Sequence, residues 1–188
     1  MLGERQMDLD QALGGRRSIR RYLNKSVSEE LVRQVIEAAT LAPSAKNGQQ
    51  WRFMALTGKA KQELTELFRR ALEKVSKRIG RENMGSSFAS CSIMEKVPVV
   101  IMVWNAGEMG WETETHSVAA AIQNMLLKAY ALGLGTLWIG DIFYTPEVLK
   151  KHLGKPWKLM AAVALGWPAY VPRARPRKSV DEVAEFIS

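Results

Sequence analysis

Apolar residues recur with helical spacing in three long stretches of the chain. Residues 59–79 and 112–132 predict two amphipathic helices, and a third is expected to end before Pro43, because the residue that precedes a proline disfavours the helical conformation. The apolar face of the first helix is formed by Leu64, Leu67, Phe68, Ala71, Leu72, Val75 and Ile79.

Capping residues predict where several helices begin. Ser26–Glu29 and Ser179–Glu182 both have the spacing of a capping box, and the second is expected to open a last helix that runs to Ile187. Shorter helices are expected over residues 7–14 and over 146–153, where proline follows a threonine N-cap.

Three short apolar runs predict strands, at residues 51–57, 97–104 and 159–165. The run at 97–104 is apolar at both odd and even positions, which is typical of a central strand that is covered on both faces. Residues 80–92 are polar and contain Gly and Ser, so we expect the most mobile segment of the chain there. The alternation of helices and strands predicts a single α+β domain over residues 1–188, with a mixed sheet flanked by helices.

The composition is that of a globular protein. The chain has 188 residues, of which 47% are hydrophobic, and no apolar run approaches the ~20 residues that span a membrane. The N-terminal stretch carries Glu4, Asp8 and Asp10 and does not have the pattern of a signal peptide. A lone cysteine, Cys91, fits a reducing compartment. We therefore expect a cytoplasmic protein that does not insert into membranes.

Positive charge changes this picture. The formal net charge is +8, and much of the excess lies in residues 16–25 and 173–178. Arg16, Ser18 and Arg20 share one parity, so an extended backbone would project them to one face, where two guanidinium groups and a hydroxyl could cradle a phosphate dianion. A solvated basic edge is the simpler alternative. A basic nucleic-acid-binding module is a further one, although no known nucleic-acid-binding motif is present.

Side chains for conventional catalysis are scarce. The two histidines, His116 and His152, fall on different predicted helices, and no metal-ligand cluster, nucleophile elbow or Walker loop is found. We expect no metal. An enzyme of this composition would take its reactivity from a bound cofactor.

Three motifs, in this order, resemble those of the nitroreductase family of FMN-dependent oxidoreductases. Arg16–Tyr22 matches the opening motif RRSxRxY, Leu41–Trp51 matches the loop APSxxNxQPW, and Gly133–Gly140 matches the turn GLGxxWIG. The resemblance extends from about Gly14 to Val183. It departs from the family at Gln50, where a proline is usual.

The resemblance implies an intertwined homodimer of three-layer subunits, with FMN bound at the subunit interface. It places Arg16, Ser18 and Arg20 on the phosphate and ribityl chain, and Arg17 near the pyrimidine edge. Arg175 and Arg177 would close over the phosphate. The ring-facing residues that it implies, the first five of them on a loop from the partner subunit, are Pro43, Ser44, Ala45, Asn47, Gln49, Trp138, Ile139 and Gly140.

The function implied by the resemblance is hydride transfer from NADH or NADPH, through flavin N5, to nitroaromatic, quinone or related electron-poor acceptors in a ping-pong cycle. A backbone N–H of Ile139 or Gly140 would approach N5, and no side chain would be catalytic. A specialised reaction on the same scaffold, such as dehalogenation or flavin modification, is the main alternative. A non-enzymatic protein that binds nucleic acid or a phosphorylated ligand is a weaker one.

Overall fold

A four-stranded sheet forms the middle layer of the protein. The computed structural model describes residues 7–187. The sheet has the strand order β1-β2-β4-β3, and every neighbouring pair is antiparallel. The parallel component of the expected mixed sheet is limited to one bridge, between Ser18 and Thr136. The strands are β1 (Trp51–Leu56), β2 (Val99–Asn105), β3 (Gly135–Ile139) and β4 (Lys158–Gly166).

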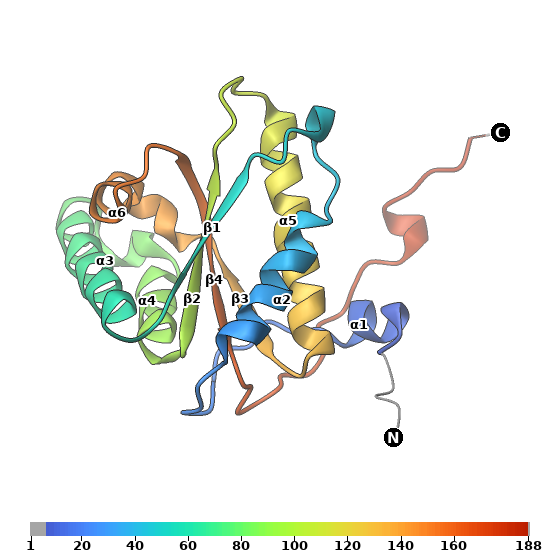
Figure 1. Cartoon of the computed structure of the whole chain (residues 1–188), viewed down its shortest axis with the longest axis horizontal. Helices are drawn as coiled ribbons and strands as arrows, with labels where there is room; N and C mark the ends of the chain where they lie inside the picture. The colour runs from blue at the N-terminus through green and yellow to red at the C-terminus, as the bar shows by residue number, and fades with distance from the viewer. Residues whose placement is uncertain (1–6, 188) are drawn as a thin grey trace.

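Helices cover both faces of the sheet, which gives the expected three-layer α+β fold (Figure 1). Helices α2 and α5 lie on one face, and α3, α4 and α6 lie on the other. The α-helices are α1 (Leu9–Gly15), α2 (Glu29–Thr40), α3 (Gly58–Ile79), α4 (Ser87–Lys96), α5 (Glu112–Ala131) and α6 (Pro146–Leu153). Single 3-10 turns are η1 (Ala45–Asn47), η2 (Arg81–Met84), η3 (Asp141–Tyr144) and η4 (Val180–Glu182).

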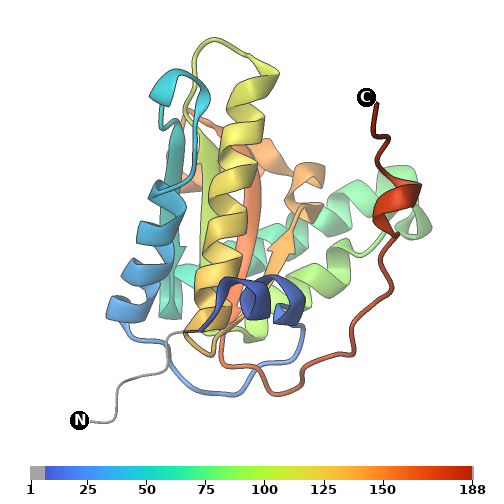
Figure 2. The ribbon, with the colours of Figure 1, turned by 90° about the vertical axis from the view of Figure 1, so that its right-hand side faces the viewer.

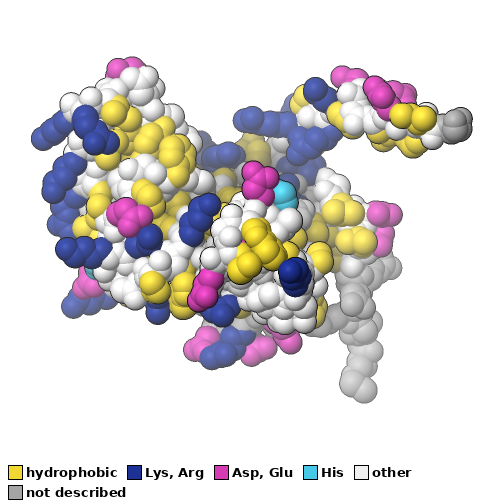
Figure 3. Space-filling view, turned by 90° about the horizontal axis from the view of Figure 1, so that it is seen from above, with side chains coloured by type: hydrophobic (Ala, Val, Ile, Leu, Met, Phe, Trp, Pro, Cys, Tyr) yellow, Lys and Arg dark blue, Asp and Glu magenta, His cyan; other side chains and the backbone are white. Residues whose placement is uncertain are grey.

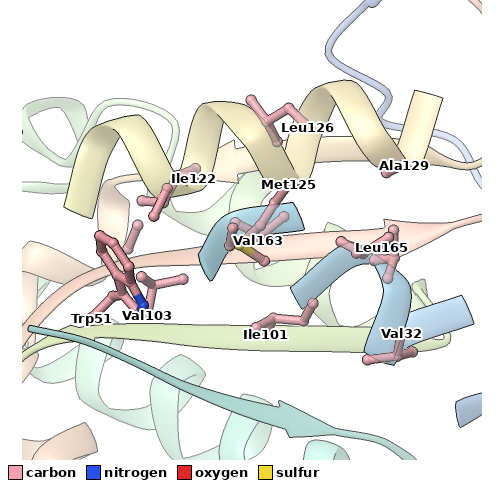
Figure 4. Close-up of a cluster of buried hydrophobic side chains, with 14 of the residues drawn as sticks. Val32, Trp51, Ile101, Val103, Ile122, Met125, Leu126, Ala129, Val163 and Leu165 are labelled. Atoms are coloured by element: carbon pink, nitrogen blue, oxygen red, sulfur yellow. The ribbon is translucent and has the colours of Figure 1, made fainter. Parts of the chain in front are cut away.

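Strand β2 is buried along its whole length, as its apolar sequence predicted. Ile101 and Val103 point into the core beneath α5 and α2, whereas Met102 and Trp104 point into the core beneath α3 and α4. Figure 4 shows the first of these cores, in which α5 lies across β2 and β4. Two separate cores therefore fix the sheet between its helical layers.

The end of α5 positions the start of β3. Gly133 has a φ of 75°, a left-handed conformation that glycine adopts without a Cβ clash, and it ends the helix. Gly135 packs against Ile19, and a Cβ at position 135 would lie only 2.6 Å from Ile19 Cγ1. The glycines of this motif thus stop the helix and let the arginine-rich segment lie against β3.

Residues 80–92, expected to be the most mobile segment, contain η2 and α4 and bury Met84 and Cys91 against α3. Two local predictions were wrong. The capping box at Ser179 forms, but only the single turn η4 follows it, and the tail beyond is exposed. Helix α2 is capped by Ser28 instead of Ser26, and the Ser28 side chain accepts a hydrogen bond from Leu31 N.

Candidate functional site

Arginines from both ends of the described chain meet in one cleft. The cleft has a volume of about 180 Å³, and none of the described residues that line it is Asp or Glu. Figure 3 shows Lys and Arg side chains gathered where the C-terminal tail leaves the body of the protein. We call it the arginine cleft, and its lining residues are Arg16, Arg17, Ser18, Arg20, Pro172, Arg173, Arg175 and Arg177.

Backbone pairing holds the N-terminal half of the arginine cleft in place. Ile19 N donates to Thr136 O at 2.8 Å, and the Ile19 side chain is buried beside β3. Its neighbours Ser18 and Arg20 have the opposite parity and line the cleft, as the sequence pattern predicted. Tyr22 strengthens the turn, since its hydroxyl donates to Ile19 O at 2.9 Å.

Mutual repulsion marks the arginine cleft as a site for an anion. Burial lowers the pKa of Arg16, and the positive charges of Arg177 and Arg17 lower it further. Within residues 7–187, no carboxylate lies within salt-bridge distance of any arginine of the cleft. Arg17 instead donates to the carbonyl oxygens of Gly14 and Arg16, at 2.6 and 2.8 Å. An anion bound between these guanidinium groups would relieve the repulsion.

Strand β3 offers backbone groups beside the arginine cleft. It is an edge strand, and Thr136 O faces away from β4, because that oxygen accepts a hydrogen bond from Ile19 N. Antiparallel alternation then directs the carbonyl of Ile139 toward β4 and the N–H of Gly140 toward the open edge. Trp138, which precedes them in the chain, is 41% exposed. Of the two residues that the sequence left open, Gly140 is the one with an outward N–H.

The loop of residues 43–50 forms a second group of predicted site residues. Ser44 O accepts from Asn47 N at 2.9 Å, and Ser117 Oγ on α5 accepts from Ala45 N at 3.0 Å. Pro43, Asn47 and Gln49 are exposed, whereas Ser44 and Ala45 are half-buried.

Backbone strain accumulates in this loop. Lys46, Asn47 and Gln49 all have positive φ, between 44° and 53°. Non-glycine residues seldom adopt this region, and strained backbone of this kind clusters at functional sites. Gln50 is buried at 7% exposure, and its Oε1 has no hydrogen-bond partner.

The two groups of predicted residues lie at opposite ends of α5. The loop is attached to Ser117 near the start of the helix, whereas the Arg16 side of the molecule lies beside Tyr130 near its end. The rise of an α-helix separates these two positions by about 20 Å. Figure 2 shows η1 at one end of α5 and α1, which leads into the arginine segment, at the other. One chain therefore brings together the arginine cleft and β3, but not the loop.

Sequence reasoning missed the anchor of the segment after Gly140. Asp141 accepts hydrogen bonds from Ser86 Oγ, at 2.8 Å, and from Ser90 Oγ. Tyr144 OH donates to Asn83 O at 2.9 Å. The partners in these hydrogen bonds are more than 50 residues apart in sequence, so no local pattern predicts them.

Other kinds of site find no support in the described part of the chain. It contains no group of three side chains that could hold a metal ion, and none of its helices is both long and apolar enough to cross a membrane. His116 and His152 are exposed and lie outside the residues discussed above.

The fold and site define an α+β protein with an arginine-lined cleft beside an edge strand. The family model described as the Nitroreductase family matches residues 13–167. The chain therefore belongs to the nitroreductase family, as its three motifs indicated.

Three similar proteins illustrate the range of the family. A candidate NADH dehydrogenase/NAD(P)H nitroreductase of Methanothermobacter thermautotrophicus is 28% identical over 179 residues, covering 90% of this chain and 82% of that protein. The 5,6-dimethylbenzimidazole synthase of Rhodospirillum rubrum is 27% identical over 175 residues, covering 85% and 82%. The crystal structure of a candidate nitroreductase from Desulfovibrio desulfuricans, in complex with FMN, is 30% identical with a TM-score of 0.76, covering 94% and 95%.

Proposed function

We propose that this protein is an FMN-dependent oxidoreductase that passes hydride from NADH or NADPH to nitroaromatic, quinone or related electron-poor acceptors. The observation that carries the proposal is the arginine cleft, in which cations from distant parts of the chain converge and no carboxylate of residues 7–187 neutralises them. The phosphate of FMN has a charge near −2 and needs several donors of this kind.

The arginine cleft fits the phosphate end of the cofactor. Arg16 and Ser18 from one side and Arg175 and Arg177 from the other would bind the phosphate oxygens, and Arg20 would reach the ribityl chain. Arg17 donates to the carbonyl oxygens of Gly14 and Arg16, and its guanidinium group would reach the pyrimidine edge of the ring.

Strand β3 fits the ring end. The outward N–H of Gly140 is a hydrogen-bond donor at an open strand edge, and the peptide of Trp138–Ile139 lies beside it. When bound, FMN supplies the N5 atom that accepts and releases hydride, so the protein needs no catalytic side chain. The residues of the chain bind, orient and shield the cofactor, and successive ligands use one pocket in a ping-pong cycle.

A second subunit would complete the site. The loop that carries Pro43, Ser44, Ala45, Asn47 and Gln49 lies near the start of α5, and the arginine segment of the same chain lies near its end, about 20 Å of helix away. A twofold axis that sets two α5 helices antiparallel would bring each loop to the cleft of the other subunit. Exposed apolar side chains support such a dimer, because several of them lie on α1, beside the loop and on the C-terminal tail: Leu9, Leu13, Leu41, Phe186 and Ile187.

The proposal is tested by absorbance and turnover. Purified protein should be yellow, should hold one FMN per subunit, and should oxidise NADH or NADPH when a quinone or nitro compound is present. Protein that stays colourless after incubation with FMN and gel filtration would refute it.

A specialised flavin reaction is the alternative, favoured by the similarity to a 5,6-dimethylbenzimidazole synthase. A lid formed by residues 80–92 would have supported it, but that segment is packed against α3. The two are distinguished by photoreducing the bound flavin under anaerobic conditions, admitting oxygen and analysing the products. The alternative predicts that the flavin itself is lost at this point.

A further inference from the structure

The outer helical layer carries a groove that has no part in the proposed flavin site. It lies between α3 and the η3–α6 segment and has a volume of about 590 Å³. The sheet separates this layer from α5, beside which the ring-facing loop lies (Figure 1). We call it the α3–α6 groove, and its lining residues are Leu67, Arg70, Ala71, Lys74, Val75, Arg78, Tyr144, Thr145, Pro146, Glu147 and Val148.

Two parallel stripes on α3 form one wall of the groove. Leu67, Ala71 and Val75 recur every four residues and make an apolar stripe. Arg70, Lys74 and Arg78 have the same spacing and make a basic stripe beside it. Each stripe is about 12 Å long, from the helical rise over eight residues. Figure 3 shows basic side chains along the outer edge of the lobe that holds α3 and α6, with apolar side chains among them.

The basic stripe is not neutralised by its own protein. Within residues 7–187, none of its three cations has a carboxylate within 4 Å, whereas the neighbouring Arg69 pairs with Glu95 at 2.6 Å. Among the described residues that line the groove, Glu147 is the only acidic one. Its side chain is 81% exposed and forms a salt bridge with Lys150 at 3.3 Å. The groove therefore has a net positive charge beside an apolar floor.

The opposite wall is apolar and fixed. Pro146 and Val148 provide the apolar side chains of this wall, and Val148 is 42% exposed. Tyr144 is held by the hydrogen bond from its hydroxyl to Asn83 O, at 2.9 Å. Thr145 is only 5% exposed, and its Oγ1 has no hydrogen-bond partner, so one hydroxyl of this wall is unsatisfied.

We propose that the α3–α6 groove binds a single-chain amphiphilic anion, with its apolar chain along Leu67, Ala71 and Val75 and its anionic head on the basic stripe. Charge complementarity selects the sign of the head group, since three unpaired cations lie on one side. The apolar stripe selects a linear chain, because it is narrow, straight and open along α3. None of the residues that line the groove is assigned to the proposed flavin site, so we expect its occupancy not to depend on FMN binding.

The test uses the purified full-length protein and dodecanoate, below its micellar concentration, in a calorimetric titration. Dodecanoate should bind with a stoichiometry of one per subunit. Dodecanol, which lacks the charge, and acetate, which lacks the chain, should each bind at least tenfold more weakly. Equal binding of dodecanol would overturn the role of the basic stripe, and equal binding of acetate would overturn the role of the apolar one.

Paired variants locate the site. Lys74→Gln combined with Arg70→Gln should weaken dodecanoate binding at least tenfold, while Lys77→Gln, an exposed lysine of the same helix outside the groove, should leave it unchanged. FMN content should stay the same in all of these variants. No binding of dodecanoate by the parent protein, an equal loss in both variants, or binding only to anionic vesicles would overturn the proposal.

Discussion

Replacing Arg177 with glutamine should weaken FMN binding without weakening the fold. Arg177 lines the arginine cleft, and its charge contributes to the lowered pKa of Arg16. A charge-assisted hydrogen bond contributes about 1.5–3 kcal/mol, so losing one to the phosphate should raise the Kd of FMN about 10- to 150-fold.

The ligand-free protein should respond in the opposite sense. Removing one of several repelling cations lowers the electrostatic cost of the folded cleft. The free energy of unfolding of the apoprotein should therefore stay within about 0.5 kcal/mol of the parent value, or rise. If the cation instead stabilised the fold through a salt bridge, its removal would both weaken FMN binding and lower the free energy of unfolding of the apoprotein.

Two assays separate these effects. Quenching of FMN fluorescence on titration with apoprotein gives the Kd, and urea unfolding of the apoprotein gives its stability. Arg33→Gln is the matched control, because Arg33 pairs with Glu29 on the exposed face of α2, away from the cleft. An unchanged Kd for Arg177→Gln, or an equal rise for Arg33→Gln, would refute the assignment of the cleft to the phosphate.

Three further outcomes test the local structure. Gly135→Ala should cost about 1–3 kcal/mol in urea unfolding, because the new Cβ would meet Ile19 Cγ1 at 2.6 Å. Lys46→Gly should leave stability unchanged or raise it by up to about 1 kcal/mol, since glycine tolerates the positive φ, whereas Lys77→Gly within α3 should cost about 1 kcal/mol. Burial raises the pKa of Cys91 to about 12, so its contribution to stability should fall as pH rises above the unfolded thiol's pKa of about 8.5, and a disulfide reagent at pH 8 should modify it only as fast as the protein unfolds.

The regular elements were predictable because their signals are local. The apolar face of residues 59–79 and the continuous apolar run of β2 depend on local pattern alone. The run of β2 was confirmed, and so was the part of the helical face formed by Leu64, Phe68 and Leu72, whereas Ile79 is exposed. The shared parity of Arg16, Ser18 and Arg20 also needed only an extended backbone, and all three line one cleft.

The errors arose where distant partners decide the structure. Residues 80–92 were expected to be mobile because they are polar, but the hydroxyls of Ser86 and Ser90 donate to Asp141, which is far away in sequence. The capping box at Ser179 forms correctly, yet Phe186 is 84% exposed, so no packing within the chain extends the helix.

A site shared between two subunits predicts complementation between two defective chains. One variant, Arg16→Gln with Arg177→Gln, disables the arginine cleft. The other, Asn47→Asp with Gln49→Glu, replaces amide donors in the loop with carboxylates that repel the carbonyl oxygens of a flavin ring. Each homodimer alone should lose FMN. A heterodimer of the two would contain one intact site, formed by the cleft of the loop variant and the loop of the cleft variant.

The FMN content of that heterodimer, purified through two different affinity tags, is the most direct measurement of the central claim. We predict one FMN per heterodimer, half the content of the parent dimer. A heterodimer without FMN would show that cleft and loop act within one chain, and would contradict the shared site.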